Sequence, residues 1–373
     1  MRVIATVFLT ALIGTAQTNV RPGDLRKLLH GQRPVTAVAF LKHGTRLVSA
    51  DMDGSIAMWN PQRRKLLWKI DLDDASRTKQ SYTISEISNI AVSPDESSIA
   101  VSYNRGLVIG DTLQGKDENR ILLINASHGR HQLRSIGEHA GLIGESAFSP
   151  NGKYIVSVSA DKTARLWGAE TGRMIWSADL RGRGHSVAFS RDGRLVAIGA
   201  LSEGPSVPVI EIRNAETGRL ERELKQGKQD VADLAFSNDG NLLAVLSNDV
   251  EGSQVELWDT ATFFLTRTLV EPGYFDHCLT LSPDDRLLFT GGFSGEHGMI
   301  TVHDLRSGRQ STRNIPEEVA SIAVREDGMI AAGTWKGKIF LVGQPDVLVR
   351  YLPAPPLPFT MPLHAARHLP RFI

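Results

Sequence analysis

One short pattern recurs seven times along the chain, and it constrains the fold more than any other feature. Each copy is an apolar run of three residues followed by a turn of the Ser-Pro-Asp-Gly type. The last apolar residues of the seven runs are Phe40, Val92, Phe148, Phe189, Phe236, Leu281 and Val324. Successive copies lie 41 to 56 residues apart. Because a repeat of this length cannot bury its apolar face alone, the seven repeats must pack against one another.

Within a repeat, apolar and polar residues alternate in four short segments, which predicts four β-strands. In the first repeat these segments are 35–40, 46–49, 55–59 and 65–70. A four-stranded sheet packed between two neighbours has both faces covered, and closing the ring of sheets removes its free ends. The pattern therefore predicts an all-β, seven-bladed β-propeller of four-stranded blades.

A second landmark lies about 20 residues after the run in the best copies. It is an apolar residue, then tryptophan, then Asn, Gly or Asp, at Trp59, Trp167 and Trp258. With these residues the chain resembles the WD-repeat β-propeller family over residues 24–344. The resemblance is specific for the fold and weak for function, since this fold supports many unrelated roles.

The resemblance also implies a structural hydrogen-bond network inside the best-kept blades. In the third repeat the matching residues are His139, Ser157, Asp161 and Trp167. In the first repeat Ser49, Asp53 and Trp59 match, and either His30 or Gln32 fills the histidine place. We expect these polar residues to be structural rather than catalytic, because such a buried network satisfies its own members.

The last repeat needs an outer strand to close the ring. Residues 25–29, which precede the first repeat, look like an outer strand. Family resemblance implies that this N-terminal strand completes the seventh blade, and we expect this arrangement. The alternative is that residues 347–351 supply the strand locally.

Both ends of the chain differ in kind from the repeats. Arg2, the uncharged run from Val3 to Ile13 and a small residue at Ala16 are typical of a signal peptide, and the run is too short to span a membrane. We expect residues 1–16 to be cleaved and the protein to be exported, periplasmic or extracellular. The alternatives are a misassigned start codon or a buried strand, with a cytoplasmic protein if the signal is not used. Residues 345–373 contain seven prolines and are expected to form a tail outside the ring.

The chain shows no strong signal for catalysis or for a charged partner. Its 42 basic and 41 acidic residues balance, which argues against nucleic acid. Its single cysteine, Cys278, excludes an intrachain disulfide and is expected to be a small buried apolar residue. Nucleophile elbows, zinc-protease motifs and phosphate-binding loops are missing. We therefore predict no catalytic, cofactor-binding or metal-binding residues.

The departures from the repeat suggest a binding face. Connections between second and third strands are long in four repeats, at 104–119, 201–208, 248–253 and 293–298. All fall on one face of a propeller, where binding commonly occurs, although tolerated drift is the alternative because long loops cost little stability. In the seventh repeat Trp335 and Lys336 occupy the apex of the corresponding turn. An exposed tryptophan there would anchor an interface, unless it packs under a neighbouring loop.

We predict a monomeric, non-catalytic scaffold that binds a protein or peptide partner on this looped face, without a cofactor, nucleic acid or a membrane span. The candidate partner-binding residues are Trp335, Lys336, His185, His277 and Arg105. His185 and His277 occupy the same position in two inner strands, near the predicted channel mouth. The alternative is a hydrolase or lactonase at the channel that would use these histidines and Asp233. A domain of a larger sensor is a third possibility.

Overall fold

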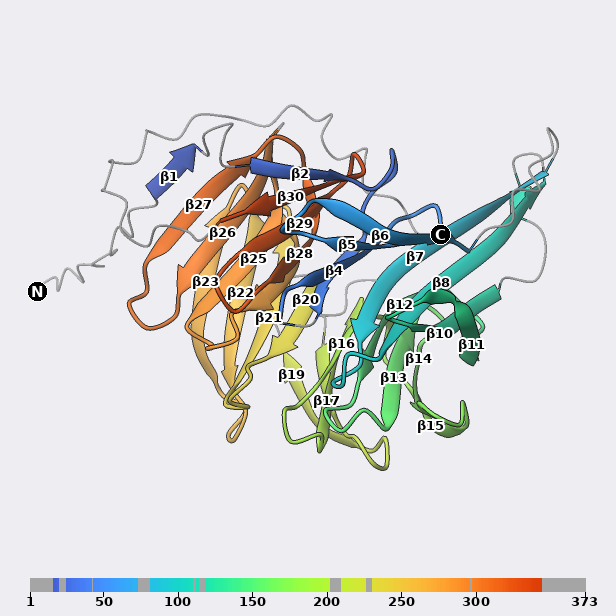
Figure 1. The fold of residues 1–373 in the computed structure, drawn as a ribbon. Coiled ribbons are helices and arrows are strands. Elements are labelled where there is room, and N and C mark those ends of the chain that lie inside the picture. The colour runs from blue at the N-terminus through green and yellow to red at the C-terminus, as the bar shows by residue number, and fades with distance from the viewer. Residues whose placement is uncertain are drawn as a thin grey trace, which may run out of the picture.

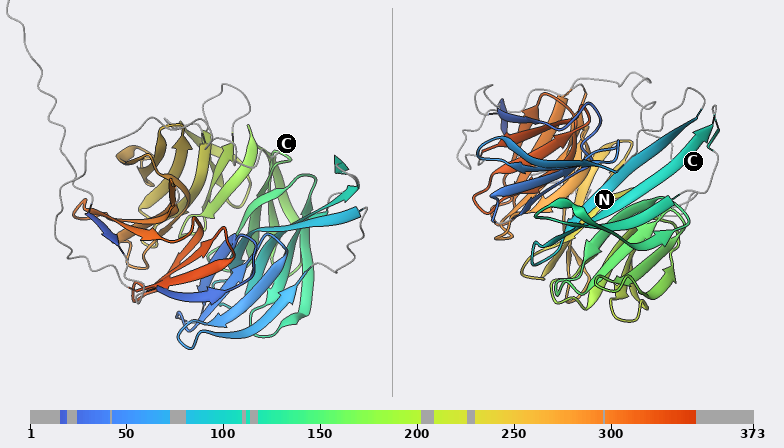
Figure 2. Two further views of the ribbon diagram at one scale, coloured as in Figure 1. Left: turned by 90° about the horizontal axis from the view of Figure 1, so that it is seen from above. Right: turned by 45° about the vertical axis from the view of Figure 1, so that its right-hand side comes forward.

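The computed structural model describes residues 16–19, 25–41, 43–72, 81–109, 112–113, 118–201, 209–225, 230–295 and 297–343. These residues form seven antiparallel four-stranded sheets, two of which gain an extra strand, and they contain no helix. The first strand of every sheet contacts the first strands of both neighbouring sheets, so the sheets form a closed ring (Figures 1 and 2). The predicted seven-bladed propeller is confirmed.

The first three blades follow the chain in order. Blade 1 consists of β3 (Ala37–Leu41), β4 (Arg46–Ala50), β5 (Ser55–Asn60) and β6 (Lys65–Asp71). Blade 2 consists of β7 (Ser81–Val92), β8 (Ser98–Ile109), β10 (Glu118–Asn125) and β11 (Gly129–His139), with β9 (Thr112–Leu113) beside β8. Blade 3 consists of β12 (Ile143–Phe148), β13 (Tyr154–Ser159), β14 (Thr163–Gly168) and β15 (Met174–Asp179).

The next three blades repeat this order. Blade 4 consists of β16 (Arg183–Phe189), β17 (Leu195–Leu201), β18 (Val209–Asn214) and β19 (Leu220–Lys225). Blade 5 consists of β20 (Asp230–Phe236), β21 (Leu242–Asp249), β22 (Gly252–Asp259) and β23 (Leu265–Pro272). Blade 6 consists of β24 (Phe275–Leu281), β25 (Leu287–Ser294), β26 (His297–Asp304) and β27 (Gln310–Ile315), and β1 (Ala16–Asn19) pairs with β27 in parallel.

Blade 7 closes the ring with strands from both ends of the propeller. It consists of β28 (Val319–Val324), β29 (Ile330–Thr334), β30 (Lys338–Val342) and β2 (Leu25–Leu29). Strand β2 is antiparallel to β30, with Leu25 opposite Val342. The predicted closure by the N-terminal strand is therefore confirmed. The alternative strand at 347–351, the predicted signal peptide up to residue 15 and the proline-rich tail lie outside the described residues.

The recurrent turn that defines the repeat has a local chemical cause. In blade 3 the Ser149 hydroxyl donates to Asn151 at 2.7 Å and accepts the N–H of Tyr154 at 3.0 Å. Gly152 completes this turn at a φ of 70°, a conformation that glycine adopts without strain. The corresponding serine and aspartate of blades 2, 4, 5 and 6 make the same pair of bonds. The turn residues thus fix the link between the first two strands.

The tryptophan network occurs in blades 1 and 3. In blade 3 the Ser157 hydroxyl lies 2.9 Å from Trp167 Nε1 and 2.8 Å from His139 Nε2, and His139 Nδ1 lies 3.0 Å from Asp161. Because both Trp167 and His139 are buried, this network satisfies polar atoms that water cannot reach.

Blade 1 builds the same network with one different residue. His30 occupies the position that His139 has in blade 3, and its Nδ1 lies 2.6 Å from the Ser49 hydroxyl. The indole N–H of Trp59 donates to the same hydroxyl at 2.8 Å. The carboxylate beside His30 belongs to Asp51, at 3.2 Å, so the expectation for Asp53 is wrong. Asp51 is buried beneath the turn, whereas Asp53 is partly exposed and pairs with Arg33.

The remaining blades replace the tryptophan. Register places Ile124, Arg213, His303 and Val342 where blades 1, 3 and 5 have tryptophan. Arg213 pairs with buried Glu211 and donates to the carbonyl groups of Asp179 and Gly218. Each blade therefore fills this space with side chains of its own, which explains why the sequence landmark fades while the architecture persists.

Candidate binding surface around the channel mouth

The long connections predicted for blades 5 and 6 are extensions of the strands themselves, so the expectation of loops is wrong for these blades. In blade 2 the described residues 104–109, 112–113 and 118–119 of the predicted connection are also strand, and its residues 110–111 and 114–117 lie outside the described residues. Pairing continues to Asp249 opposite Gly252 in blade 5 and to Ser294 opposite His297 in blade 6. In blade 2 the long strands β7 and β8 project beyond the other blades (Figure 1). Continued backbone pairing gives these insertions a defined shape that a free loop would lack. Residues 202–208 of blade 4 lie outside the described residues.

Four aromatic side chains gather where the extended hairpin of blade 6 meets blade 7. Phe275 lies opposite Phe293 in register, and their rings stack at 5.6 Å. His277 stacks on Phe293 at 5.7 Å, and Trp335 meets the His277 ring edge-on at 5.8 Å. We call these four residues the aromatic cluster. All four side chains are partly exposed, so the cluster presents apolar rings at the surface.

A polar contact fixes the aromatic cluster between the two blades. The carboxylate of Glu318, in the connection between β27 and β28, lies 3.0 Å from His277 Nε2. The backbone carbonyl of the same residue accepts the N–H of Trp335 at 3.1 Å. One residue of the blade 6 to blade 7 connection therefore contacts the His277 side chain of blade 6 and the Trp335 backbone of blade 7, which preorganises the surface.

Trp335 is less exposed than its place at a turn apex suggests. Its side chain is half-buried against His277, and its indole N–H is buried without an acceptor. Trp335 is therefore less exposed than expected at this apex, because His277 of blade 6 covers part of its ring. The adjacent Lys336 is exposed.

The other two candidate residues lie apart from the aromatic cluster. His185 belongs to blade 4, two blades away from His277, although both sit at the bulge of an inner strand. Burial lowers the pKa of His185, which favours its neutral form. Arg105 lies on β8 in blade 2, 3.9 Å from Glu118. The structure thus brings together His277 and Trp335 but not His185 or Arg105.

Sequence reasoning missed Phe275, Phe293 and Glu318. A signal for the first was present, because Phe275 precedes His277 by two residues and so shares its side of a strand. Phe293 required the register between β24 and β25, and Glu318 required the position of the blade connection. The alternation of apolar and polar residues along a single strand reveals neither this register nor the position of the connection.

A second set of side chains occupies one register position on all seven inner strands. We call it the ring position. Its residues are Ala37, Asn89, Glu145, Ser186, Asp233, Cys278 and Ser321. In six of the seven blades a β-bulge in the inner strand lies immediately at this position, and a bulge redirects the side chains around it.

Several ring-position side chains tie one blade to the next. Asn89 accepts the N–H of Ser146 at 3.3 Å, and Glu145 accepts the N–H of Val187 at 3.0 Å. Further round, Asp233 accepts the N–H of Leu279 at 2.8 Å. Each bond crosses from one inner strand to its neighbour, so these polar groups have a structural role in the ring.

The two carboxyl groups at the ring position are strongly perturbed. Burial raises the pKa of Glu145 to about 8, and repulsion by Asp233 adds to this shift. Burial raises the pKa of Asp233 to about 7. Sequence reasoning named Asp233 but missed Glu145, whose signal is the register position that the two residues share.

A buried cluster of ionisable groups lies between blades 5 and 6, with Glu271 on β23 and with Asp276 and His303 on β24 and β26. His303, at the tryptophan place, lies 2.5 Å from Glu271, which also accepts from the Thr290 hydroxyl at 3.2 Å. Burial lowers the pKa of His303 to about 4 and raises the pKa of both Glu271 and the nearby Asp276. Within the described residues no group of three histidine, cysteine or acidic side chains has a geometry that could hold a metal ion.

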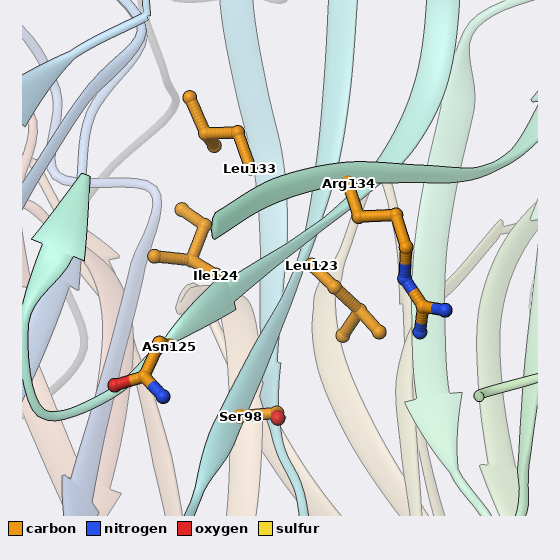
Figure 3. Close-up of a pocket in the computed structure, with 6 residues that line it drawn as sticks. All are labelled: Ser98, Leu123, Ile124, Asn125, Leu133 and Arg134. Carbon is orange, nitrogen blue, oxygen red and sulfur yellow. The ribbon is translucent and has the colours of Figure 1, made fainter. Parts of the chain in front are cut away.

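A cavity of about 480 Å³ lies in blade 2, away from the aromatic cluster (Figure 3). Its lining residues are Ser98, Leu123, Ile124, Asn125, Leu133 and Arg134. Register shifts where β11 leaves β10 between Leu123 and Asn125, which opens this space. The Arg134 guanidinium is directed to the carbonyl groups of Ala169 and Glu170 in blade 3. Arg134 is therefore engaged in a contact between blades 2 and 3.

Comparison with known proteins finds relatives with WD repeats. Residues 23–60 and 130–168 match the family model described as "WD domain, G-beta repeat". The chain is 25% identical over 284 residues to the gastrulation defective protein 1 homolog of Drosophila melanogaster, a match that covers 71% of this chain and 41% of the relative. It is 28% identical over 181 residues to U3 small nucleolar RNA-associated protein 21 of Saccharomyces cerevisiae, covering 48% and 16%.

A bacterial protein is among the relatives as well. An uncharacterized WD repeat-containing protein of Synechocystis is 26% identical over 191 residues, covering 50% of this chain and 48% of the relative. The chain spans less than half the length of these curated relatives. In the part of the chain that the structure describes, no helix has the length and apolar character needed to cross a membrane.

Proposed function

The chain is a member of the WD-repeat β-propeller family, and we propose that it is a non-catalytic scaffold that binds a protein or peptide partner through the aromatic cluster. The observation that carries this proposal is the stack of Phe275, His277 and Phe293 with Trp335 against its edge. Partly exposed aromatic rings on a rigid base are favoured anchors of protein interfaces. Lys336 extends the surface with an exposed positive charge.

The alternative, a hydrolase or lactonase at the channel, receives less support. Asp233 accepts two backbone N–H groups, from Leu234 at 2.7 Å and Leu279 at 2.8 Å. Glu145 is bonded to the N–H of Val187. A structural role explains these bonds, whereas a general acid or base needs lone pairs directed to substrate. We infer that the protein acts as a monomer without a cofactor, in keeping with a scaffold.

Substitution of Trp335 tests the binding role. Trp335→Ala is expected to weaken partner binding by about 2 kcal/mol, the loss typical of an interface hot spot. A partner would first be captured with the full chain and its affinity then measured by calorimetry. Phe264→Ala is the matched control, because Phe264 is an aromatic side chain that is 75% exposed in the β22–β23 connection at the other end of the blades. Equal affinities for parent and Trp335→Ala would reject the site.

We also propose that the protein is exported, periplasmic or extracellular. The support is Arg2, the uncharged run from Val3 to Ile13 and Ala16 at the end of the small-residue segment. N-terminal sequencing of the protein from its native source is expected to find a chain that begins at Gln17 in a fraction outside the cytoplasm. An intact Met1 in a cytoplasmic fraction would contradict the proposal.

A further inference from the structure

The aromatic cluster combines ring surfaces with an unused hydrogen-bond donor. The rings of Phe275, Phe293 and His277 stack at interplanar angles of 25° and 21°, and the Trp335 ring is tilted by 61° from His277. A ligand that crosses the cluster therefore meets rings from two blades that face in different directions. The Trp335 indole N–H finds no acceptor among the described residues. A matching ligand brings apolar surface and a carbonyl group.

The acceptors beside the cluster are already engaged. The Glu318 carboxylate is bonded to His277 at 3.0 Å, and the Glu318 carbonyl accepts the backbone N–H of Trp335 at 3.1 Å. A docked segment with N–H groups needs acceptors, because a buried N–H without a partner costs free energy. A polyproline II segment brings no N–H at its prolines, and its carbonyl groups are free because this helix has no internal hydrogen bonds. Such a segment also docks on aromatic side chains with little loss of conformational freedom, so it matches the cluster.

The chain itself carries a segment of this composition. Residues 352–358 read Leu-Pro-Ala-Pro-Pro-Leu-Pro and belong to the tail that follows β30. Gly343 is the last described residue before this tail, and its carbonyl accepts a hydrogen bond from Arg313 of β27 at 3.2 Å. The chain therefore leaves blade 7 beside blade 6, and these are the two blades that form the aromatic cluster.

The tail is long enough to bring this segment to the cluster. Strand β30 has 5 residues, so about 17 Å separate the Trp335 end of blade 7 from Val342. Gly343 and Pro353 are 10 positions apart in the sequence, and an extended chain of that length reaches about 31 Å. Because the segment is tethered to the propeller, its effective concentration at the cluster is on the order of millimolar. Weak contacts are then enough to keep the cluster occupied.

We propose that the aromatic cluster binds a polyproline II segment, and that residues 352–358 of the same chain occupy it in the free protein. Proline rings pack on the stacked aromatic side chains, and a carbonyl group of the segment accepts the Trp335 indole N–H. The external partner is then a proline-rich extended segment, and the tail is its internal competitor. This competition rests on the proposed function, since it requires a partner that docks on the same cluster.

Binding of a synthetic peptide tests the proposal. The probe is a fluorescein-labelled peptide of residues 350–360, and the control peptide has alanine at every proline. Each is titrated against the parent chain and against a four-alanine variant, which is the full chain with Pro353→Ala, Pro355→Ala, Pro356→Ala and Pro358→Ala. We expect the probe to bind the four-alanine variant about ten-fold more tightly, because the tail of the parent fills the cluster for about nine-tenths of the time. The control peptide should bind neither chain.

Further substitutions in the four-alanine variant locate the binding site. Trp335→Ala should weaken probe binding by about ten-fold or more, as for an interface anchor. Phe264→Ala, which changes an exposed aromatic residue of blade 5, is the matched control and should have no effect. Hydrogen–deuterium exchange at 334–337 should be faster in the four-alanine variant than in the parent, because docking of the tail protects these amides. Exchange in the turn at 149–153 should be the same in both chains.

Each of four binding results would overturn the proposal. They are a probe that binds neither chain, equal probe affinity for the parent and the four-alanine variant, binding of the control peptide, and probe affinity that Trp335→Ala leaves unchanged. Sedimentation covers the case in which a second copy supplies the tail. A dimeric parent beside a monomeric four-alanine variant would assign the segment to a second copy and would also overturn the proposal.

Failure of this proposal is distinguishable from failure of the proposed function. If Trp335→Ala weakens binding of the captured partner but the probe binds neither chain, the proposed function stands and the polyproline II site fails. If the probe binds at Trp335 but Trp335→Ala leaves the affinity for the captured partner unchanged, the tail site stands and the aromatic cluster fails as the docking surface for that partner.

Discussion

At the residue scale, the most informative group is Glu145, because its structural bond and its acidity are both unusual. Its carboxylate accepts the N–H of Val187 from the next blade, and burial raises its pKa to about 8. An acid whose pKa is raised in the folded state favours folding below its unfolded pKa, near 4.5, and loses that contribution as the pH rises to the folded value. The titration of Glu145 therefore contributes a decline in stability from about pH 4.5 to pH 8.

Glu145→Gln tests this linkage. The amide oxygen can still accept the N–H of Val187, but it never has to carry a buried charge. We expect the variant to match the parent at pH 4 and to exceed its free energy of unfolding at pH 8 by about 2–4 kcal/mol, since each pKa unit corresponds to about 1.4 kcal/mol. Urea unfolding at the two pH values measures this difference. A constant difference at both pH values would contradict the account.

At the element scale, each blade solves the same packing problem with different residues. Trp167 packs on Gly137 of blade 2, where a Cβ would lie 2.5 Å from the indole ring, and it donates to Ser157. Blade 6 instead buries His303 with Glu271 at the equivalent place. An indole is therefore one of several fillers, and the fold tolerates replacement where a whole set of partners changes together.

Replacement of the tryptophan alone, with its partners unchanged, is expected to destabilise the blade. Trp167→Ala is expected to lower the free energy of unfolding by about 3–5 kcal/mol, because it removes a large aromatic side chain from a packed site and deprives the Ser157 hydroxyl of the indole N–H that it accepts. Chemical denaturation measures the loss. Trp167→Phe, which keeps most of the ring but not the N–H, should cost less, and an unchanged midpoint for Trp167→Ala would show that the residue does not anchor the blade.

At the scale of the whole molecule, the repeat period and the alternation of strands were enough to predict seven blades, and the family resemblance implied the closure of the ring by β2. They were not enough to predict the surface, because the register between β24 and β25 decides that Phe275 meets Phe293. The same limit applies to Asp51, whose contact with His30 depends on the three-dimensional turn. Insertions in blades 5 and 6 also looked like loops, since a sequence does not show how far strand pairing continues.

Hydrogen–deuterium exchange of the full chain, alone and bound to its captured partner, tests the central claim most directly. The account predicts that bound partner slows exchange in the segments of the aromatic cluster, at 274–278, 293–297, 317–319 and 334–337, because docking there excludes water from their amides. The turns at the other end of the blades, such as 149–153 and 190–194, should exchange at unchanged rates. Protection confined to those turns, with none at the aromatic cluster, would contradict the account.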